Sequence, residues 1–253
     1  MKKKSVGIVG CGFVGGALRR WLSEHNPDVE VFIQDPLKGF NDELSHVDVI
    51  FISIHVPTES DGSQNLAVMK QIIAGLPNKP IFVRTTILPG VSKALSDEFH
   101  KQVYFMPEFL TERMAYQDFC SQPMVFTAEA ELLSSIFIGK SYIEMSSLEA
   151  EITKYAHNVF GALKVTYFNG IFDICKRLDA DYKKVQAGIL LSGYINAPHT
   201  QVPGPDGKFG YGGKCFPKDV NALTKTVKDM GMPILSLLET LKPLNILFRG
   251  EDK

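Results

Sequence analysis

The sequence predicts an α/β fold: a doubly wound parallel sheet in residues 1–146, followed by an all-helical domain in residues 147–253. In the first part, short β-branched runs alternate with helical stretches, which is typical of a parallel sheet with helices on both faces. In the second part, apolar residues recur every three or four positions over long stretches, as in helices with one buried face. A chain of 253 residues is long enough for two domains with separate cores.

The sheet is expected to contain six short strands. The runs that predict them are residues 5–9, 30–34, 49–54, 80–84, 103–106 and 141–145. Between the first two runs a helix is expected from Phe13 to about Glu24, so the chain opens with a strand–helix–strand unit.

The helical domain is expected to begin with a long helix over residues 148–178, whose apolar side chains share one face along about eight turns. Such a helix is longer than one globular domain needs, so we expect it to act as a spine between domains or between subunits. Shorter helices are predicted over residues 181–191, 217–230 and 233–248, and a loop rich in proline and glycine over residues 196–216.

Charge and cysteine spacing exclude several classes of protein. The formal net charge of −1 argues against a nucleic acid or an anionic membrane as the main partner. The cysteines Cys11, Cys120, Cys175 and Cys215 are scattered and form no CxxC pair, so we expect neither a metal site nor a disulfide framework. The basic start at residues 1–4 leads into a strand too short for a signal peptide or membrane span, which predicts a cytoplasmic protein.

A glycine fingerprint formed by Gly10, Gly12 and Gly15 follows the first strand and opens the first helix. Gly10 permits the tight turn, Gly12 lets backbone amides approach a pyrophosphate, and Gly15 allows close packing of helix on strand. Asp35 ends the second strand 20 residues after Gly15, where a carboxylate would bond an adenosine ribose and repel a 2′-phosphate. These features predict a Rossmann-type site for NAD; the alternative is a glycine turn that only caps a helix.

The run from Gly212 to Asp219 places a thiol, Cys215, between two glycines and a helix expected to start near Pro217. The positive end of the helix dipole would favour the thiolate, which is the nucleophilic form. We therefore expect covalent chemistry at Cys215. The alternative is a small buried cysteine in a glycine loop, which is the commoner fate of a free thiol.

Six segments together carry a resemblance to a known family. They are residues 56–58 (VPT), 84–90 (RTTILPG), 106–112 (MPEFLTE), 150–158 (AEITKYAHN), 202–207 (VPGPDG) and 212–219 (GGKCFPKD). In order and content they resemble the UDP-glucose and GDP-mannose 6-dehydrogenase family. The run at residues 202–207 favours its UDP-glucose branch. The resemblance implies a two-step, four-electron oxidation of the C6 alcohol of a nucleotide sugar, UDP-glucose, to the uronic acid UDP-glucuronate, with NAD as oxidant.

The resemblance also implies the catalytic residues. Lys154 and Asn158 lie four residues apart on one helix, so an ammonium and an amide can face one oxygen and stabilise an alkoxide. Cys215 would add to the intermediate aldehyde, giving a thiohemiacetal and then a thioester. The remaining catalytic positions are Glu112 and Asp219, for water activation and proton transfer, and Thr86, for holding this water.

Binding positions follow from the same resemblance. Besides the glycines, those that match cofactor contacts are Val14, Asp35, Lys38, Thr58, Thr86, Glu112 and Lys218. Those that match sugar-nucleotide contacts are Glu108, Phe109, Leu110, Lys154, Asn158 and Gly212. Each has a plainer alternative as a helix flank, a surface acid, a helix cap or a turn residue. His199 invites a general-base role but is expected to be a loop or substrate-contact residue, and Cys11 and Cys175 are not expected to be catalytic.

The sequence departs from the family pattern at three places. Gly170 stands where an acid is usual, and Arg113 replaces a glycine after Glu112. The family continues into a second doubly wound domain of about 100 residues, which we expect this short form to lack after Lys253. We therefore expect weakened nucleotide binding, and a homodimer joined along residues 148–178 that buries the apolar face of the spine helix.

Two rival functions remain open. A single-step β-hydroxyacid dehydrogenase shares the layout of sheet and helices and a Lys/Asn helix, but it needs no cysteine. The other rival is a truncated protein that binds NAD without turnover. A two-step enzyme forms two NADH per substrate, whereas the β-hydroxyacid dehydrogenase forms one. The truncated protein would bind NAD but would neither bind UDP-glucose nor turn it over.

Overall fold

The computed structural model describes residues 3–59 and 61–250 and divides into two compact units. The first unit comprises Met1–Pro57 and Gln64–Lys154, and the second comprises Thr58–Ser63 and Tyr155–Lys253. The change from one unit to the other falls inside a long helix, a few residues after the boundary at residues 146 and 147 that the sequence suggests. That domain boundary stays a prediction.

The first unit is built on a six-stranded sheet in the order β3-β2-β1-β4-β5-β6. Its strands are β1 (Ser5–Val9), β2 (Glu30–Asp35), β3 (Phe40–Asn41), β4 (Val49–Ile52), β5 (Ile81–Val83) and β6 (Val103–Phe105). All pair in parallel except β3, which is antiparallel to β2. The predicted α/β class and doubly wound sheet are confirmed. The strand order reverses between β1 and β4, and ligands of such sheets bind at this switch point, beyond the carboxyl ends of the strands.

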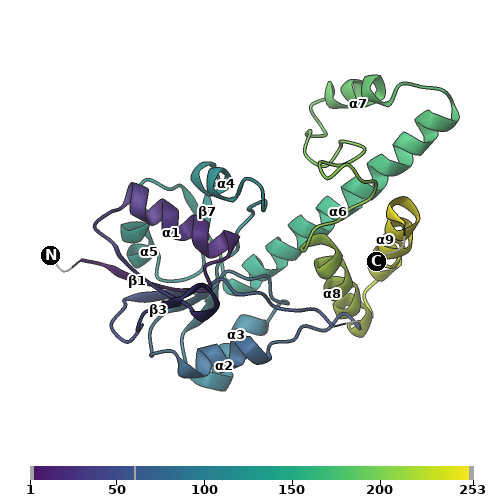
Figure 1. Cartoon of the computed structure of the whole chain (residues 1–253). Coiled ribbons are helices and arrows are strands. Elements are labelled where there is room, and N and C mark those ends of the chain that lie inside the picture. Colours follow the sequence, from purple (N-terminus) through teal and green to yellow (C-terminus); the bar gives the residue numbers. More distant parts are fainter. Residues whose placement is uncertain (1–2, 60, 251–253) are drawn as a thin grey trace. The chain divides into compact units, whose positions relative to one another are not determined.

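Helices cover both faces of the sheet (Figure 1). A central strand such as β4 is therefore buried on both sides and contributes residues to two hydrophobic cores. Val49 and Phe51 join the core beneath α1, α4 and α5, whereas Ile50 and Ile52 join the core beneath α2 and α3. Alternate residues of a strand face opposite sides, so burial on both faces requires an uninterrupted apolar run. The helices are α1 (Phe13–His25), α2 (Ala67–Gly75), α3 (Val91–Phe99), α4 (Ala115–Ser121) and α5 (Ala130–Ile136).

One predicted strand forms but lies outside the main sheet. Residues 141–145 contain β8 (Tyr142–Glu144), which pairs in parallel with β7 (Met124–Phe126) in a separate two-stranded sheet. All three residues of β8 are exposed, so it lacks the buried faces of a central parallel strand. Strand β3 has only two residues, too few to show a strand period, and the sequence analysis also misses β7.

The second unit is helical (Figure 1). Phe168 and Cys175 pack with Tyr182 in a small core, so the chain folds back after its long helix. Its elements are the greater part of α6 (Ser147–Arg177), then α7 (Tyr182–Leu190), α8 (Phe216–Asp229) and α9 (Leu235–Arg249). These bounds confirm the four predicted helices to within two residues at each end. Within the residues that the structure describes, none of the helices combines the length and hydropathy of a membrane span.

Candidate active site

Two of the three glycines in the turn after β1, Gly10 and Gly15, are needed for steric reasons. Gly10 has a φ of +84°, and a side chain there would lie 2.8 Å from the carbonyl oxygen of Ser53. A Cβ at Gly15 would lie 2.0 Å from the carbonyl oxygen of Gly10, so only glycine lets α1 pack this closely on the turn. Gly12 has open space beside it and starts α1 without a side-chain cap. The first amides of α1 are therefore suited to a phosphate group.

Asp35 lies at the end of β2 beside this turn. Its Oδ2 accepts a hydrogen bond of 2.8 Å from the Cys11 amide, and Lys38 Nζ donates to the Cys11 carbonyl oxygen at 2.6 Å. Gly10, Asp35 and the exposed Leu37 line an open groove of about 810 Å³. A carboxylate and apolar walls beside a glycine turn fit the adenosine half of NAD.

Two buried hydroxyl groups, Ser53 Oγ and Thr58 Oγ1, have no hydrogen-bond partner in the described part of the chain. Buried polar atoms without partners are rare, and an unseen ligand or water is a common reason for them. The Ser53 amide donates to the carbonyl oxygen of Val9 at the end of β1, so Ser53 lies at the switch point of the sheet. Sequence reasoning finds Thr58 but misses Ser53, because a serine after a strand is an ordinary turn residue.

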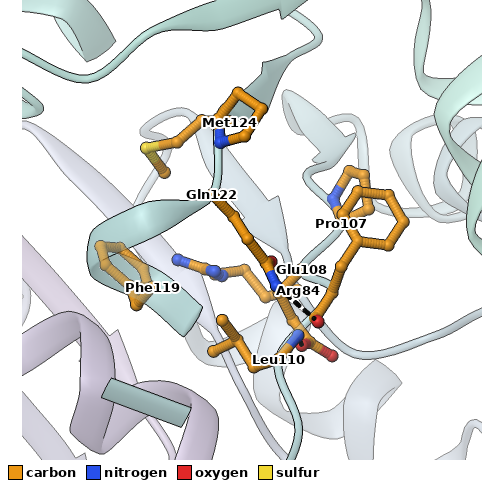
Figure 2. Close-up of a pocket in the computed structure, with 9 residues that line it drawn as sticks. Arg84, Pro107, Glu108, Leu110, Phe119, Gln122 and Met124 are labelled. Atoms are coloured by element: carbon orange, nitrogen blue, oxygen red, sulfur yellow. Dashed lines mark hydrogen bonds between the residues drawn. The ribbon is translucent and has the colours of Figure 1, made fainter. Parts of the chain in front are cut away.

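Lys154 and Glu108 form a buried ion pair in the first unit. Lys154 Nζ lies 3.1 Å from Glu108 Oε1 and also donates to the Glu108 carbonyl oxygen. Glu108 Oε2 accepts from the amide of Leu110 at 2.6 Å (Figure 2), and the Lys154 ammonium lies 5.4 Å from the centre of the Phe109 ring. Only 3% of Lys154 and 8% of Glu108 are exposed. The structure thus brings together four residues that the sequence assigns to substrate binding.

Three other predicted residues lie elsewhere in the first unit. Thr86 is buried just after β5, and its carbonyl oxygen accepts from Gln64 Nε2 at 3.1 Å. Glu112 is exposed on the loop between β6 and α4, and Val14 is half-buried in the first turn of α1. The roles assigned to these residues stay predictions.

The second unit gathers three polar residues at the start of α8. Asp219 is fully buried; its Oδ2 accepts from Asn158 Nδ2 at 2.6 Å, and its Oδ1 accepts from Lys218 Nζ at 2.5 Å. The Asp219 amide donates to the carbonyl oxygen of Cys215 at 2.9 Å, so Cys215 is the N-cap of α8. The half-buried thiol is thus one position closer to the helix than the sequence suggests. A thiolate is favoured at a helix N-terminus.

Asparagine side chains from α6 and α9 hold the loop that precedes Cys215. Asn245 Oδ1 accepts from the amide of Tyr211 at 2.7 Å, and Asn245 Nδ2 donates to the Tyr211 carbonyl oxygen at 3.0 Å. Asn169 Oδ1 accepts from the amide of Gly210 at 3.0 Å. Sequence reasoning misses both asparagines, because a polar residue in an amphipathic helix gives no sign of a distant partner.

Arg249, in the last turn of α9, holds the same loop. Its guanidinium pairs with Asp206 at 2.6 Å and donates to the Gly210 carbonyl oxygen at 3.3 Å. A Cβ at Gly212 would lie 2.2 Å from Arg249 Nη2. A side chain at Gly212 would therefore displace the guanidinium, which is the flexible end of a long side chain, and the substrate contact at Gly212 stays a prediction.

The remaining cysteine and histidine candidates lie in ordinary surroundings. Cys175 is buried in the core between α6 and α7, and the ring of His199 lies 5.2 Å from that of Phe216. Among the described residues, no group of three or more His, Cys, Asp and Glu side chains could hold a metal ion.

Comparison with known proteins identifies similar sequences. Residues 148–246 match the model of the UDP-glucose/GDP-mannose dehydrogenase family, central domain. The chain is similar to the UDP-glucose 6-dehydrogenase of Rhizobium meliloti (strain 1021), with 29% identity over 236 residues that cover 82% of this chain and 53% of that protein. It is also similar to UDP-glucose 6-dehydrogenase TuaD of Bacillus subtilis (strain 168), with 27% identity over 216 residues, 76% of this chain and 46% of that protein. The chain spans about half the length of these relatives.

Solved structures share the fold. A UDP-glucose dehydrogenase from the hyperthermophilic archaeon Pyrobaculum islandicum matches with a TM-score of 0.80 and 24% identity, over 96% of this chain and 68% of that one. A ternary complex of GDP-mannose dehydrogenase from Pseudomonas aeruginosa matches with a TM-score of 0.65 and 24% identity, over 98% and 69%. At these identities the likeness establishes the fold over nearly the whole chain.

Proposed function

We propose that this chain, which belongs to the UDP-glucose/GDP-mannose dehydrogenase family, catalyses the NAD-dependent oxidation of UDP-glucose to UDP-glucuronate. The observation that carries the proposal is the group of residues at the start of α8. Asp219, in the turn that Cys215 caps, accepts hydrogen bonds from Lys218 in the same turn and from Asn158 of α6. A thiol at a helix N-terminus suits the covalent oxidation of an aldehyde. A single-step dehydrogenase has no use for it.

The residues of the glycine turn would hold the cofactor. The first amides of α1 at Gly12 suit the pyrophosphate, and the Asp35 carboxylate suits the adenosine ribose. Because a carboxylate repels a 2′-phosphate, NAD is favoured over NADP. When bound, NAD supplies the hydride acceptor for both oxidations. The further residues assigned to it are Val14, Lys38, Thr58, Thr86, Glu112 and Lys218.

In the first oxidation, Lys154 and Asn158 stabilise the negative charge that develops on the C6 oxygen. They lie four residues apart on α6 and so point from the same side of the helix. Glu108 fixes the ammonium of Lys154, and Asp219 fixes the amide of Asn158. Side chains that are ordered before the substrate arrives lose little entropy when it binds.

In the second oxidation, the Cys215 thiolate adds to the aldehyde carbon, and the resulting thiohemiacetal is oxidised to a thioester. The aldehyde stays bonded to sulfur, so it has no need to leave the enzyme. Water then adds to the thioester carbonyl, the C–S bond breaks, and the carboxylate and the thiol are released. We assign proton transfer from this water to Glu112 and Asp219, and its positioning to Thr86.

The yield of NADH tests the proposal. With UDP-glucose the protein should form two NADH per substrate, and Cys215→Ala should lower UDP-glucuronate formation by about 10³-fold or more, whereas Cys120→Ser, at an exposed thiol, should leave it unchanged. One NADH per substrate and an active Cys215→Ala variant would support a β-hydroxyacid dehydrogenase instead. Calorimetric binding of NAD without UDP-glucose binding or turnover would support a non-catalytic role.

We also propose a homodimer joined along residues 148–178. Large apolar side chains spaced by four, seven or eight positions share one side of a helix, and a two-fold interface would bury them twice. On α6 and just beyond it, the exposed ones are Leu148, Ile152, Phe160, Tyr167, Ile174 and Leu178. Light scattering should give a dimer that Phe160→Glu dissociates and Lys176→Glu, at an exposed polar position, does not. A monomeric wild-type protein would contradict the proposal.

A further inference from the structure

A small pocket in the first unit surrounds the side chain of Arg84, which follows β5 (Figure 2). Its other walls come from residues 107–110 after β6, from Phe119 of α4 and from residues 122–124. The cavity measures about 20 Å³. A cavity of about 10–15 Å³ holds one water molecule, so this pocket has room for one or two particles of that size. The proposed oxidation makes no use of Arg84.

Two of the three guanidinium nitrogens of Arg84 lack a hydrogen-bond acceptor in the described part of the chain. The residue is 2% exposed, and its Nε and Nη1 groups have no hydrogen-bond partner in the described part of the chain. The side chain runs toward the ring of Phe119, whose centre lies 5.2 Å from the guanidinium carbon (Figure 2). On another wall, the side-chain amide of Gln122 donates to the carbonyl oxygen of Phe109 at 3.2 Å. A buried charged donor without an acceptor is strongly destabilising, so an acceptor from outside the chain would stabilise this site.

The charges around the pocket do not balance. Burial lowers the pKa of Arg84 to about 10 and the charge of Glu108 opposes this, so the guanidinium stays protonated at neutral pH. A second cation, Lys140, lies 5.4 Å from the centre of the same Phe119 ring. The carboxylate of Glu108 is already paired with Lys154. Glu108 is the one carboxylate among the residues that line the pocket, so the charge of Arg84 has no free counter-ion there, and a bound anion would supply one.

Size and wall chemistry select the anion. A phosphate or a sugar carboxylate needs more room than about 20 Å³, and a water molecule carries no charge. The side chains of Pro107, Phe119 and Met124 give the pocket apolar walls, which suit an anion that sheds its water readily. We propose that this pocket binds one small monovalent anion of the halide class, chloride in solution, through the N–H groups of Arg84. The site adjoins the 108–110 loop and does not depend on the proposed function.

Crystals of the wild-type protein grown in bromide test the site directly. The expected result is an anomalous difference peak in the pocket, in contact with Arg84 Nε and Nη1, that is absent from crystals grown in gluconate. Ordered water there in both crystals would overturn the proposal. This test needs no variant, so it holds even if substitutions at Arg84 prevent folding.

Melting curves test the same site in solution. Above the dissociation constant, the Tm should rise by about 3–6 °C for each tenfold increase in chloride, measured against gluconate of equal ionic strength, which is too large for the pocket. Arg84→Met should abolish this difference and Arg84→Lys should reduce it, whereas Arg177→Met, at an exposed arginine of α6, should retain it. Equal chloride dependence in wild type and the Arg84 variants would overturn the proposal. A bromide peak in the crystal without a chloride dependence of the Tm would also overturn it, because that result means binding at crystal concentration only.

Discussion

The glycine turn of the first unit and the cysteine loop of the second are stabilised in different ways. In the turn, the closest packing contact joins two residues of the same motif, Gly15 and Gly10, and Asp35 adds one hydrogen bond to the Cys11 amide. The loop before Cys215 is held by Asn169 and Asn245, whose hydrogen bonds span 41 and 34 residues. A local motif therefore specifies the turn, whereas the loop depends on α6 and α9 being in place. Substitutions in the two regions should change different measurable quantities.

The largest effect is expected in the cysteine region, at the carboxylate of Asp219. Asp219→Asn removes the charge that pairs with Lys218 and leaves a single acceptor oxygen in place of the two that hold Lys218 and Asn158. Steady-state kinetics should show kcat lower by about 10²–10⁴-fold, the range for losing a positioned acid or base. Asp229→Asn, an exposed acid at the end of the same helix, is the matched control and should leave kcat unchanged. A kcat for Asp219→Asn within tenfold of wild type would contradict the assignment.

In the turn, two neighbouring glycines should separate stability from binding. Gly15→Ala places a Cβ 2.0 Å from the Gly10 carbonyl oxygen, so α1 must shift, with an expected loss of about 1–3 kcal/mol and about 100-fold weaker NAD binding. Gly12→Ala has room and should keep the wild-type Tm, yet it should also bind NAD poorly because the methyl occupies the path of the pyrophosphate. Calorimetry and melting curves measure both. Wild-type NAD affinity in Gly12→Ala would show that the pyrophosphate lies elsewhere.

The same contrast explains which features of the structure the sequence predicts and which it does not. The glycine turn, Asp35 and the span of α6 follow from local spacing, and the structure has a turn and a helix where the sequence predicts them. Ser53, Asn245 and Arg249 escape prediction, because each matters through a contact with a chain segment that is distant in sequence or with a ligand. Strand β8 is assigned to the wrong sheet for a related reason, since local spacing shows where a strand lies but not which strand it pairs with.

A smaller effect is expected where α9 holds the cysteine loop. Asn245→Ala removes two hydrogen bonds to Tyr211, which should lower the free energy of unfolding by about 1–3 kcal/mol. We expect kcat to fall by about 10-fold through displacement of Cys215, while the dissociation constant of NAD stays at its wild-type value. Thr240→Ala, at an exposed position of α9, is the control. Weaker NAD binding in Asn245→Ala would mean that the two regions are coupled.

The smallest effect is expected at Asp35, where charge and hydrogen bonding can be separated. Asp35→Ala loses both the acceptor for the Cys11 amide and the bond to the ribose, so NAD binding should weaken by about 10-fold. Asp35→Asn keeps an acceptor for Cys11 but removes the charge that repels a 2′-phosphate, so it should gain affinity for NADP while the turn stays intact. Glu30→Ala, an exposed acid at the start of the same strand, should change neither affinity. If Asp35→Asn rejects NADP as strongly as wild type in calorimetric titrations, the preference for NAD comes from the shape of the groove rather than from this carboxylate.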